Sequence, residues 1–168
     1  MKHLPISGKF GYIKVLVDDS DYEGLLQYTW WVAEKSTNYK VVYTQIKRKT
    51  IILARMLLSP ESGKLVDHID RNPLNNQRSN LRIVGYRENS INTGIKKSNK
   101  SGVIGVDRVK ATGRWRATIR INGIKKSLGE YESIEEAKEV RCNAEKLYYG
   151  EYCPIYEDPM NPKESKDG

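Results

Sequence analysis

A polar and basic stretch near the middle of the chain, residues 92–101 (NTGIKKSNKS), most limits how this chain can fold. The hydrophobic patterns on its two sides differ, so the stretch predicts a boundary between two small domains in a chain of 168 residues. Each domain has a modest core, because small domains bury a smaller share of their surface. We expect domains at residues 1–94 and 102–157, a basic linker at 95–101 and a disordered tail at 158–168.

Positive charge is concentrated just after this boundary. The formal net charge is +8, and residues 95–131 alone carry ten basic and two acidic residues. Self-repulsion at this density predicts a polyanionic partner rather than only a solvated basic face. No apolar run approaches the ~18 residues of a membrane span. The N-terminus lacks the apolar core of a signal peptide, so we expect a cytoplasmic protein.

Histidine and cysteine are scarce. The chain contains only His3, His68, Cys142 and Cys153, which are too few and too scattered for a zinc finger. We therefore expect two free thiols. Any catalytic metal should be a hard ion held by oxygen ligands.

The first 60 residues predict short strands and two short helices. Residues 4–17 favour one or two strands, and Ser20 to Glu23 has the form of a capping box before a short helix. Strands around a polar turn at residues 36–38 should follow, and then a helix at 51–58 that ends before Pro60. The aromatic residues of this region are expected in the core of a small sheet, with base stacking as the alternative. They are Trp30, Trp31, Tyr39 and Tyr43.

The region that follows predicts a strand, a loop, a second strand and a helix. Residues 64–66 form the first strand, with Asp67 and His68 at its end. Residues 71–76 (RNPLNN) are a dense turn signal. Residues 81–84 alternate as a second strand, and residues 86–92 should be helical.

Four polar residues of this region suit phosphodiester hydrolysis. His68 can accept a proton from water near neutral pH, and the oxygens of Asp67 and Asn89 suit a hard ion such as Mg²⁺. Asn80 is expected to tie the loop to backbone and fix the imidazole. Neighbouring strand residues point to opposite sides, so the strand must end or bend here. Alternatively, Asp-His is a chance pair and the asparagines only form turns, but the fixed set on one strand–loop–strand–helix pattern argues against this.

Residues 64–92 resemble the ββα-metal site of HNH endonucleases, especially the phage and intron-encoded homing type. The Asp67-His68 pair, Asn80 in SNLR and Asn89 match the motif positions. The resemblance implies that His68 is the general base and that Asp67 and Asn89 bind metal. Cleavage would leave 3′-hydroxyl and 5′-phosphate ends. This His-Asn-Asn version implies Mg²⁺ or Mn²⁺, with no zinc expected. The upstream region is also similar and offers Arg55 for phosphate contact.

The second domain predicts three strands and one helix. Residues 103–109, 115–121 and 125–131 alternate, and Asn122-Gly123 is a strong hairpin signal. Ser133 to Glu136 forms a capping box for a helix that should end at Gly150. The apolar stripe expected to pack on the sheet comprises Ile134, Ala137, Val140, Ala144, Leu147 and Tyr148.

This domain resembles the DNA-binding domain of plant ethylene-response factors, the AP-two type, in SGVIGV, GRWRATIRINGIKKSLGEY and Tyr149-Gly150-Glu151. In that family a three-stranded sheet lies in the major groove. Alternation turns Arg116, Thr118 and Arg120 outward. Asp107, Val109 and Ser127 depart from the family pattern, so the target sequence is not predicted. The residues expected to contact DNA here are Arg108, Lys110, Arg114, Arg116, Thr118, Arg120, Lys125 and Lys126.

The combined prediction is an α+β protein with a ββα-metal (HNH) nuclease domain followed by a three-stranded antiparallel sheet packed on one helix. We expect a site-specific, one-metal endonuclease for double-stranded DNA. It would be a monomer or weak dimer without a membrane partner, in a bacterial or phage-infected cell. Two other classes stay open, a DNA-binding regulator with an inactive HNH unit and an RNA- or structure-binding module.

Overall fold

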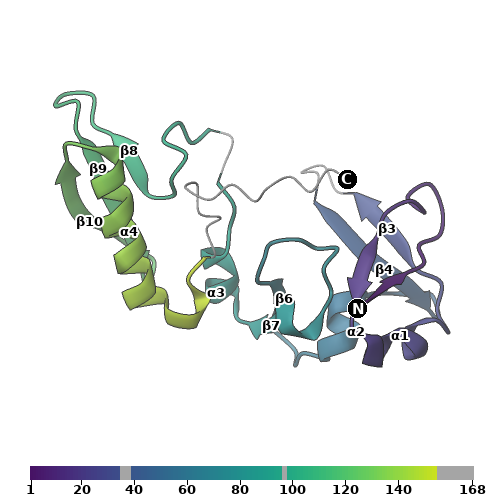
Figure 1. Ribbon diagram of the computed structural model, residues 1–168. Helices are drawn as coiled ribbons and strands as arrows, with labels where there is room; N and C mark the ends of the chain where they lie inside the picture. The colour runs from purple at the N-terminus through teal and green to yellow at the C-terminus, as the bar shows by residue number, and fades with distance from the viewer. Residues whose placement is uncertain (35–38, 96–97, 155–168) are drawn as a thin grey trace. The chain divides into compact units, whose positions relative to one another are not determined.

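The computed structural model describes residues 1–34, 39–95 and 98–154 (Figure 1). It divides the chain into two compact units, residues 1–92 (unit 1) and 93–168 (unit 2). Both units combine helices with antiparallel strand pairs, in agreement with the α+β class. The predicted turn at 36–38 and the predicted tail at 158–168 lie outside the described residues. Within the described part, no helix is long and apolar enough to span a bilayer.

The described residues of unit 1 form three small sheets and three short α-helices. β1 pairs with β2, β4 lies between β3 and β5, and β6 pairs with β7. Its elements are β1 (Lys2–Leu4), β2 (Val15–Val17), α1 (Asp19–Leu25), β3 (Trp31–Glu34), β4 (Lys40–Ile46), β5 (Lys49–Ile52), α2 (Leu53–Leu58), β6 (Leu65–His68), the 3₁₀ helix η1 (Arg78–Asn80), β7 (Leu81–Val84) and α3 (Tyr86–Ile91).

The core of unit 1 gathers around Trp30, which is 1% exposed. Its indole Nε1 donates to the Leu25 carbonyl, so the polar edge of the ring is satisfied inside an apolar cluster. Trp31 is half-buried and its ring lies 6.0 Å from that of Tyr43. The prediction of a core aromatic is confirmed for Trp30 but is wrong for Tyr39, which is 47% exposed.

Two local predictions for unit 1 are wrong for identifiable reasons. Ser20 does not cap α1, because the helix begins two residues earlier than predicted and its N-cap residue is Asp18. The carboxylate of Asp18 accepts from the backbone N–H of Arg78 instead. The helix expected at 51–58 begins only at Leu53, because residues 51 and 52 complete a strand paired with β4.

Unit 2 is a three-stranded antiparallel sheet with one long helix. Its elements are β8 (Val106–Arg108), β9 (Trp115–Ile121), β10 (Ile124–Tyr131), α4 (Ile134–Tyr149) and the 3₁₀ helix η2 (Gly150–Tyr152). The Asn122-Gly123 turn joins β9 and β10 with positive φ at both residues. The capping box of Ser133 and Glu136 and the C-cap at Gly150 are confirmed.

Helix α4 packs on β9 through small residues. Ala117 of β9 and Ala137 of α4 are both fully buried, together with Val106 of β8. The apolar stripe predicted along α4 is wrong at its end, since Leu147 is 76% and Tyr148 50% exposed. Arg141 and Glu145 of α4 form a buried salt bridge instead.

The predicted linker is partly folded onto unit 2. The hydroxyl of Ser101 donates to the carbonyls of Val103 and Val106, and the Asn99 side chain donates to Val103. Gly105 then has φ +75°, and a Cβ there would lie 2.4 Å from the Thr118 carbonyl oxygen. Only glycine fits this close approach. Residues 103–105 lie before β8, so this strand is shorter than the one predicted at 103–109.

Candidate active site

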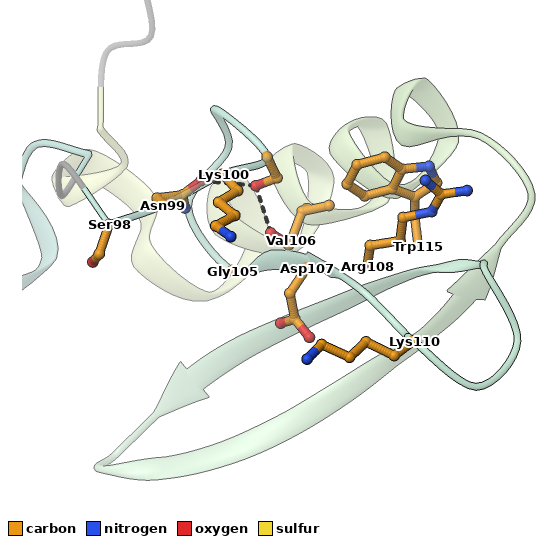
Figure 2. A pocket seen from close by; sticks show the side chains of 10 residues that line it. Ser98, Asn99, Lys100, Gly105, Val106, Asp107, Arg108, Lys110 and Trp115 are labelled. Carbon is orange, nitrogen blue, oxygen red and sulfur yellow. Dashed lines mark hydrogen bonds between the residues drawn. The ribbon is translucent and has the colours of Figure 1, made fainter.

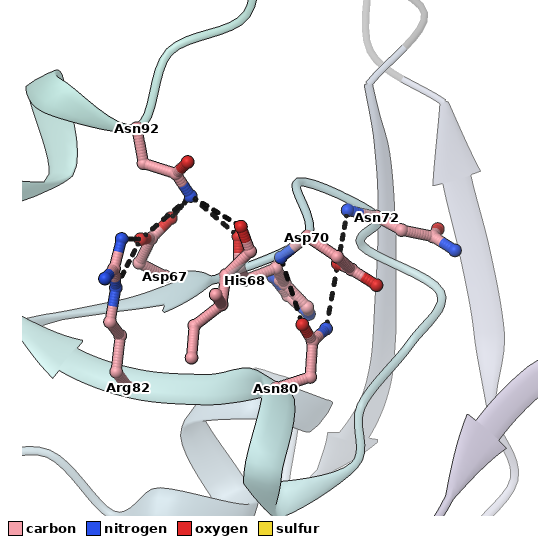
Figure 3. Close-up of polar contacts among 8 residues, drawn as sticks. Asp67, His68, Asp70, Asn72, Asn80, Arg82 and Asn92 are labelled. Carbon is pink, nitrogen blue, oxygen red and sulfur yellow. Dashed lines mark hydrogen bonds and ion pairs between the residues drawn. The ribbon is translucent and has the colours of Figure 1, made fainter. Parts of the chain in front are cut away.

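The end of β6 brings the polar residues of unit 1 together (Figure 3). Asp67 and His68 occupy the last two strand positions and pair with Arg82 and Leu81 of β7. The register stays regular through His68, so the two side chains leave the strand on opposite sides. The strand was predicted to end or bend at this pair, but it continues in register through His68 and ends only after it. Each side chain has its own set of partners.

The carboxylate of Asp67 is held by a cation and an amide. Arg82 Nε donates to its Oδ2 at 2.9 Å, and a terminal guanidinium nitrogen lies 2.8 Å from the same oxygen. Asn92 Nδ2 lies 3.1 Å from each carboxylate oxygen. The same nitrogen donates to the His68 carbonyl at 2.8 Å. Asn92 therefore joins the Asp67 side chain to the backbone at the strand end (Figure 3).

The imidazole of His68 is oriented by Asn76. Its Nε2 lies 3.2 Å from Asn76 Oδ1, and both residues are buried. The Nδ2 of Asn76 donates to the Pro73 carbonyl, so the oxygen of this amide faces the ring. The neutral imidazole consequently carries its proton on Nε2 and its lone pair on Nδ1.

Burial is the main influence on the charge of His68. It lowers the pKa of His68 from the ordinary 6.5, against smaller raising effects from the Asn76 hydrogen bond and from the charges of Asp70 and Asp67. The neutral ring is therefore favoured at physiological pH, which is the form that can accept a proton.

Asn80 locks the loop that follows His68. Its Oδ1 accepts from the Asp70 backbone N–H at 3.0 Å, and its Nδ2 donates to the Asp70 carboxylate and to the Asn75 carbonyl at 2.9 and 2.8 Å. Asn80 thus ties the loop, whereas the ring of His68 is held by Asn76 and not by Asn80 as expected. A role for Asn80 in catalysis stays a prediction.

The N-terminal strands and α1 support this loop from a distant part of the sequence. The backbone of Leu16 accepts from the Asn76 N–H and donates to the Leu74 carbonyl, both at 2.8 Å. Arg78 makes a two-pronged ion pair with Asp21, with both contacts at 2.8 Å. The position of Asn76, and through it that of the imidazole, therefore depends on residues near the start of the chain.

Asn89 and Asn92 both belong to the α3 region but differ in what the structure shows of them. Asn89 is half-buried within α3, and its predicted metal contact stays a prediction. Asn92 follows the helix directly, is 6% exposed, and contacts Asp67. The sequence pattern did not identify Asn92, and it indicated only a turn for Asn76. The one signal for Asn92 was its position three residues after Asn89, which is on the same side of a helix.

The oxygen atoms around Asp67 fit a hard divalent ion. Among the described residues, no three His, Cys, Asp or Glu side chains gather in a group that could hold a metal. A cation would therefore need Asp67 together with amide and water oxygens, which suits Mg²⁺ or Mn²⁺. Among the described residues, Asn92 alone donates a hydrogen bond to Asp67 Oδ1, so this oxygen keeps a lone pair. The buried Oδ1 of Asn92 has no hydrogen-bond partner.

Two further residues of unit 1 lie near this centre. Burial and then the negative charge of Asp67 raise the pKa of Tyr39, so its phenol stays protonated and able to donate. Arg55 of α2 donates from a guanidinium nitrogen to the Lys64 carbonyl at 2.8 Å, just before β6. Arg55 therefore anchors the strand that carries Asp67 and His68, and its predicted phosphate contact stays a prediction.

The residues predicted to contact DNA in unit 2 lie on both faces of the sheet. On the face opposite α4, Arg116 is flanked across the strands by Asp107 and Glu130 and forms an ion pair with Asp107. Nearer the Asn122-Gly123 turn, Arg120 and Lys125 are directly paired on that same face, without an acidic neighbour in register. Positive charge on this face is therefore concentrated at the turn end.

Other members of the predicted set have different surroundings. Thr118 is 6% exposed and its hydroxyl donates to the Gly105 carbonyl, so the prediction that it is offered to DNA is wrong. Arg114 is paired with Glu132. Arg108 lies across from Trp115, and Lys126 across from Ile119, on the side that faces α4.

A hollow of about 520 Å³ lies beside β8 (Figure 2). Lys100, Arg108 and Lys110 contribute its basic groups, and Trp115 contributes an indole ring. The Arg108 guanidinium lies 5.9 Å from the centre of that ring. The lining also includes the carboxylate of Asp107, so the hollow combines basic groups with one acidic group.

Comparison with known proteins relates the segment around β6 to nucleases. Residues 59–91 match the family model described as HNH endonuclease. The chain is 31% identical over 131 residues to the uncharacterized HNH endonuclease L560 of Acanthamoeba polyphaga mimivirus, covering 75% of this chain and 65% of that protein. It is 44% identical over 61 residues to Protein 3.8 of Escherichia phage T7, covering 36% of this chain and 50% of that protein. The chain thus spans less than two thirds of either relative. No solved structure matches it.

Proposed function

We propose that this protein is a DNA endonuclease that hydrolyses phosphodiester bonds with the help of one divalent metal ion. The observation that carries the proposal is the buried imidazole of His68, held by Asn76 and adjacent in β6 to the Asp67 carboxylate. Both residues lie within the segment that matches the HNH endonuclease model. The similarity to a viral HNH endonuclease supports the same activity.

His68 acts as the general base in this proposal. Its Nδ1 makes no hydrogen bond with the described residues and is the basic atom of the neutral ring. Nδ1 takes a proton from a water molecule while the water oxygen forms a bond to phosphorus. The bond between phosphorus and O3′ breaks, and O3′ leaves with its electron pair and gains a proton from solvent. The products carry a 3′-hydroxyl and a 5′-phosphate.

Asp67 and Asn89 would hold the metal ion, with Mg²⁺ or Mn²⁺ as the ions that suit oxygen ligands. When bound, the ion supplies Lewis-acid stabilisation of the charge that builds up on the phosphate and on the leaving oxygen. Arg82 and Asn92 orient the Asp67 carboxylate. Outer contacts of this kind tune the affinity and geometry of metal ligands.

Unit 2 holds double-stranded DNA in this proposal. Support comes from the paired Arg120 and Lys125 on the exposed sheet face and from the ten basic residues between positions 95 and 131. Side chains of this kind contact phosphate oxygens and position a protein on the duplex. A preference for particular DNA sites would arise on the same surface.

The test is incubation of the purified protein with supercoiled plasmid in Mg²⁺, Mn²⁺ or EDTA, followed by mapping of the ends. A His68→Ala preparation controls for contaminating nucleases. We expect nicked or linear DNA with 5′-phosphate ends in metal and intact DNA in EDTA. Tight DNA binding without cleavage in either metal would instead support the alternative, a DNA-binding regulator whose HNH unit is inactive.

A further inference from the structure

The turn between β4 and β5 has an unusual backbone for its residues. The two strands are in register up to Ile46 and Lys49, so Lys47 and Arg48 alone form the connection. Both have positive φ, +48° and +63°. Positive φ at both central residues defines the type I′ turn, which strongly favours Asn-Gly because side chains with a Cβ are strained there.

The same chain contains the favoured form of this turn. Asn122 and Gly123 connect β9 and β10 with φ of +52° and +79°. Glycine adopts this conformation without steric cost, and asparagine tolerates it. Lysine and arginine are therefore a strained choice at positions 47 and 48, and strained backbone of this kind concentrates at functional sites.

The side chains of this turn are unpaired cations. Lys47, Arg48 and Lys49 are exposed, and none of their side chains makes a hydrogen bond or ion pair with a described residue. Two other cations of unit 1 are paired, Lys2 with Glu23 and Arg78 with Asp21. Three adjacent positive charges without a carboxylate partner favour a polyanionic ligand.

We infer that the β4–β5 turn is a phosphate-contacting site through which unit 1 itself binds the backbone of double-stranded DNA. The inference rests on the proposed nuclease function, which makes DNA the polyanion within reach. Lysine and arginine contact phosphate oxygens without reading base sequence. The site would thus hold the duplex on the unit that carries His68, independently of unit 2.

A continuous path of secondary structure joins the turn to the candidate active site within unit 1. β5 leads from Lys49 directly into α2, and Arg55 of α2 donates to the Lys64 carbonyl at the start of β6. A phosphate held by the turn is therefore bound by the same folded body as Asp67 and His68. This arrangement positions the duplex as well as adding affinity.

The experiment measures binding of a fluorescent DNA duplex by the full-length protein in EDTA across a series of salt concentrations. The main variant combines Lys47→Asn, Arg48→Gly and Lys49→Thr, which places Asn-Gly in the turn and removes three charges. We expect the slope of log affinity against log salt to become shallower by about 2.7, at roughly 0.9 for each phosphate that the protein no longer neutralises. Affinity at low salt should fall as well.

Two single variants separate charge from strain. Arg48→Gly removes one charge and the strain at that position, whereas Lys49→Thr removes one charge from an ordinary strand position. Each should change the slope by about 0.9, and only Arg48→Gly should raise the melting temperature. The control is Lys146→Gln, an exposed lysine of α4, which should leave the slope unchanged.

A slope equal to that of the wild-type protein in the triple variant and in Lys49→Thr would overturn the inference. The outcome is independent of cleavage, because binding is measured without metal. If the wild-type protein cuts plasmid DNA but the turn variants keep its salt slope, only this inference fails. If the slope changes as expected but no metal supports cleavage, the proposed nuclease function fails and the binding site stands.

Discussion

In unit 1 most of the buried polar side chains among the described residues lie around the end of β6, whereas in unit 2 two of them, Arg141 and Glu145, lie on α4. The unit 1 cluster consists of Asp67, His68, Asn76, Asn80 and Asn92. It leaves the Nδ1 of His68 and one lone pair of Asp67 without a partner among the described residues. These unused atoms are the ones that could act on a substrate or a metal.

The unit 2 cluster centres on the salt bridge between Arg141 and Glu145, one helical turn apart, at 2.6 Å. Both side chains are almost fully buried. Arg141 also donates to the carbonyls of Ile104 and Thr118, which joins α4 to β9 and to the segment before β8. Its donors serve backbone groups, so this cluster holds the fold together. Burial of polar residues therefore does not by itself mark a reactive site, because such residues also serve to join elements of the fold.

The largest expected effect comes from His68→Ala. Removal of a general base typically lowers the rate by about 10²–10⁴-fold, so cleavage in Mg²⁺ should nearly vanish. DNA affinity in EDTA should change little, whereas the melting temperature should fall, because Asn76 Oδ1 stays buried without its partner. Rates from single-turnover cleavage and affinities from fluorescence anisotropy test this. Cleavage at the wild-type rate would exclude His68 as the base.

Arg141→Met tests the structural cluster. It leaves Glu145 buried without its partner, and breaking a buried ion pair costs about 3–5 kcal/mol. Urea denaturation should therefore show a large loss of stability. The double variant Arg141→Met with Glu145→Leu removes both charges and should recover much of that loss. A double variant as unstable as the single one would show that the contacts of Arg141 with backbone carbonyls dominate.

Asn89→Ala and Asn92→Ala form a matched pair on the α3 side of the active site. Asn92→Ala removes the donor shared by Asp67 and the His68 carbonyl, and should cost about 1–3 kcal/mol of stability. Asn89→Ala should weaken Mn²⁺ binding, measured by isothermal titration calorimetry, while leaving stability nearly unchanged. If Asn92→Ala abolished Mn²⁺ binding and Asn89→Ala did not, the second ligand would be Asn92.

The smallest effect is the pH dependence of stability in EDTA. The folded pKa of His68 is lowered below 6.5 by burial, so the unfolded chain binds more protons between the two values. His68 therefore contributes stability that is fully present above pH 6.5 and is lost as the pH falls through the folded pKa. Unfolding free energies of the wild-type protein should decline more steeply on acidification than those of His68→Ala. Parallel curves would contradict the lowered pKa.

Local signals in the sequence predicted much of the fold. The turn residues 71–76, the Asn122-Gly123 pair and the Ser133–Glu136 capping box act over a few residues, and the elements next to them formed as expected. The capping box at Ser20 failed because a distant segment, residues 77–78, takes up the side chain of Asp18 and α1 starts earlier.

The candidate site was predicted in its residue types but not in its contacts. Asp67 and His68 could be recognised from their chemistry and their place at a strand end. The partnership of His68 with Asn76 and of Asp67 with Asn92 arises only when the loop and α3 fold back on β6. Thr118 is buried for the same reason, since Gly105 approaches it from outside the sheet. Alternation along one strand carries no information on such approaches.

The hydrogen bonds between β2 and the loop at residues 74–76 affect when the candidate active site is completed during folding. The hydrogen bonds of Leu16 with Leu74 and Asn76 join segments far apart in the sequence, and contacts of this kind form late because a long loop must close first. The imidazole therefore acquires its orientation only after the N-terminal strand has docked. In a chain that has not reached this closure, Asn76 is not yet held against β2, so we expect the imidazole of His68 to lack its fixed orientation.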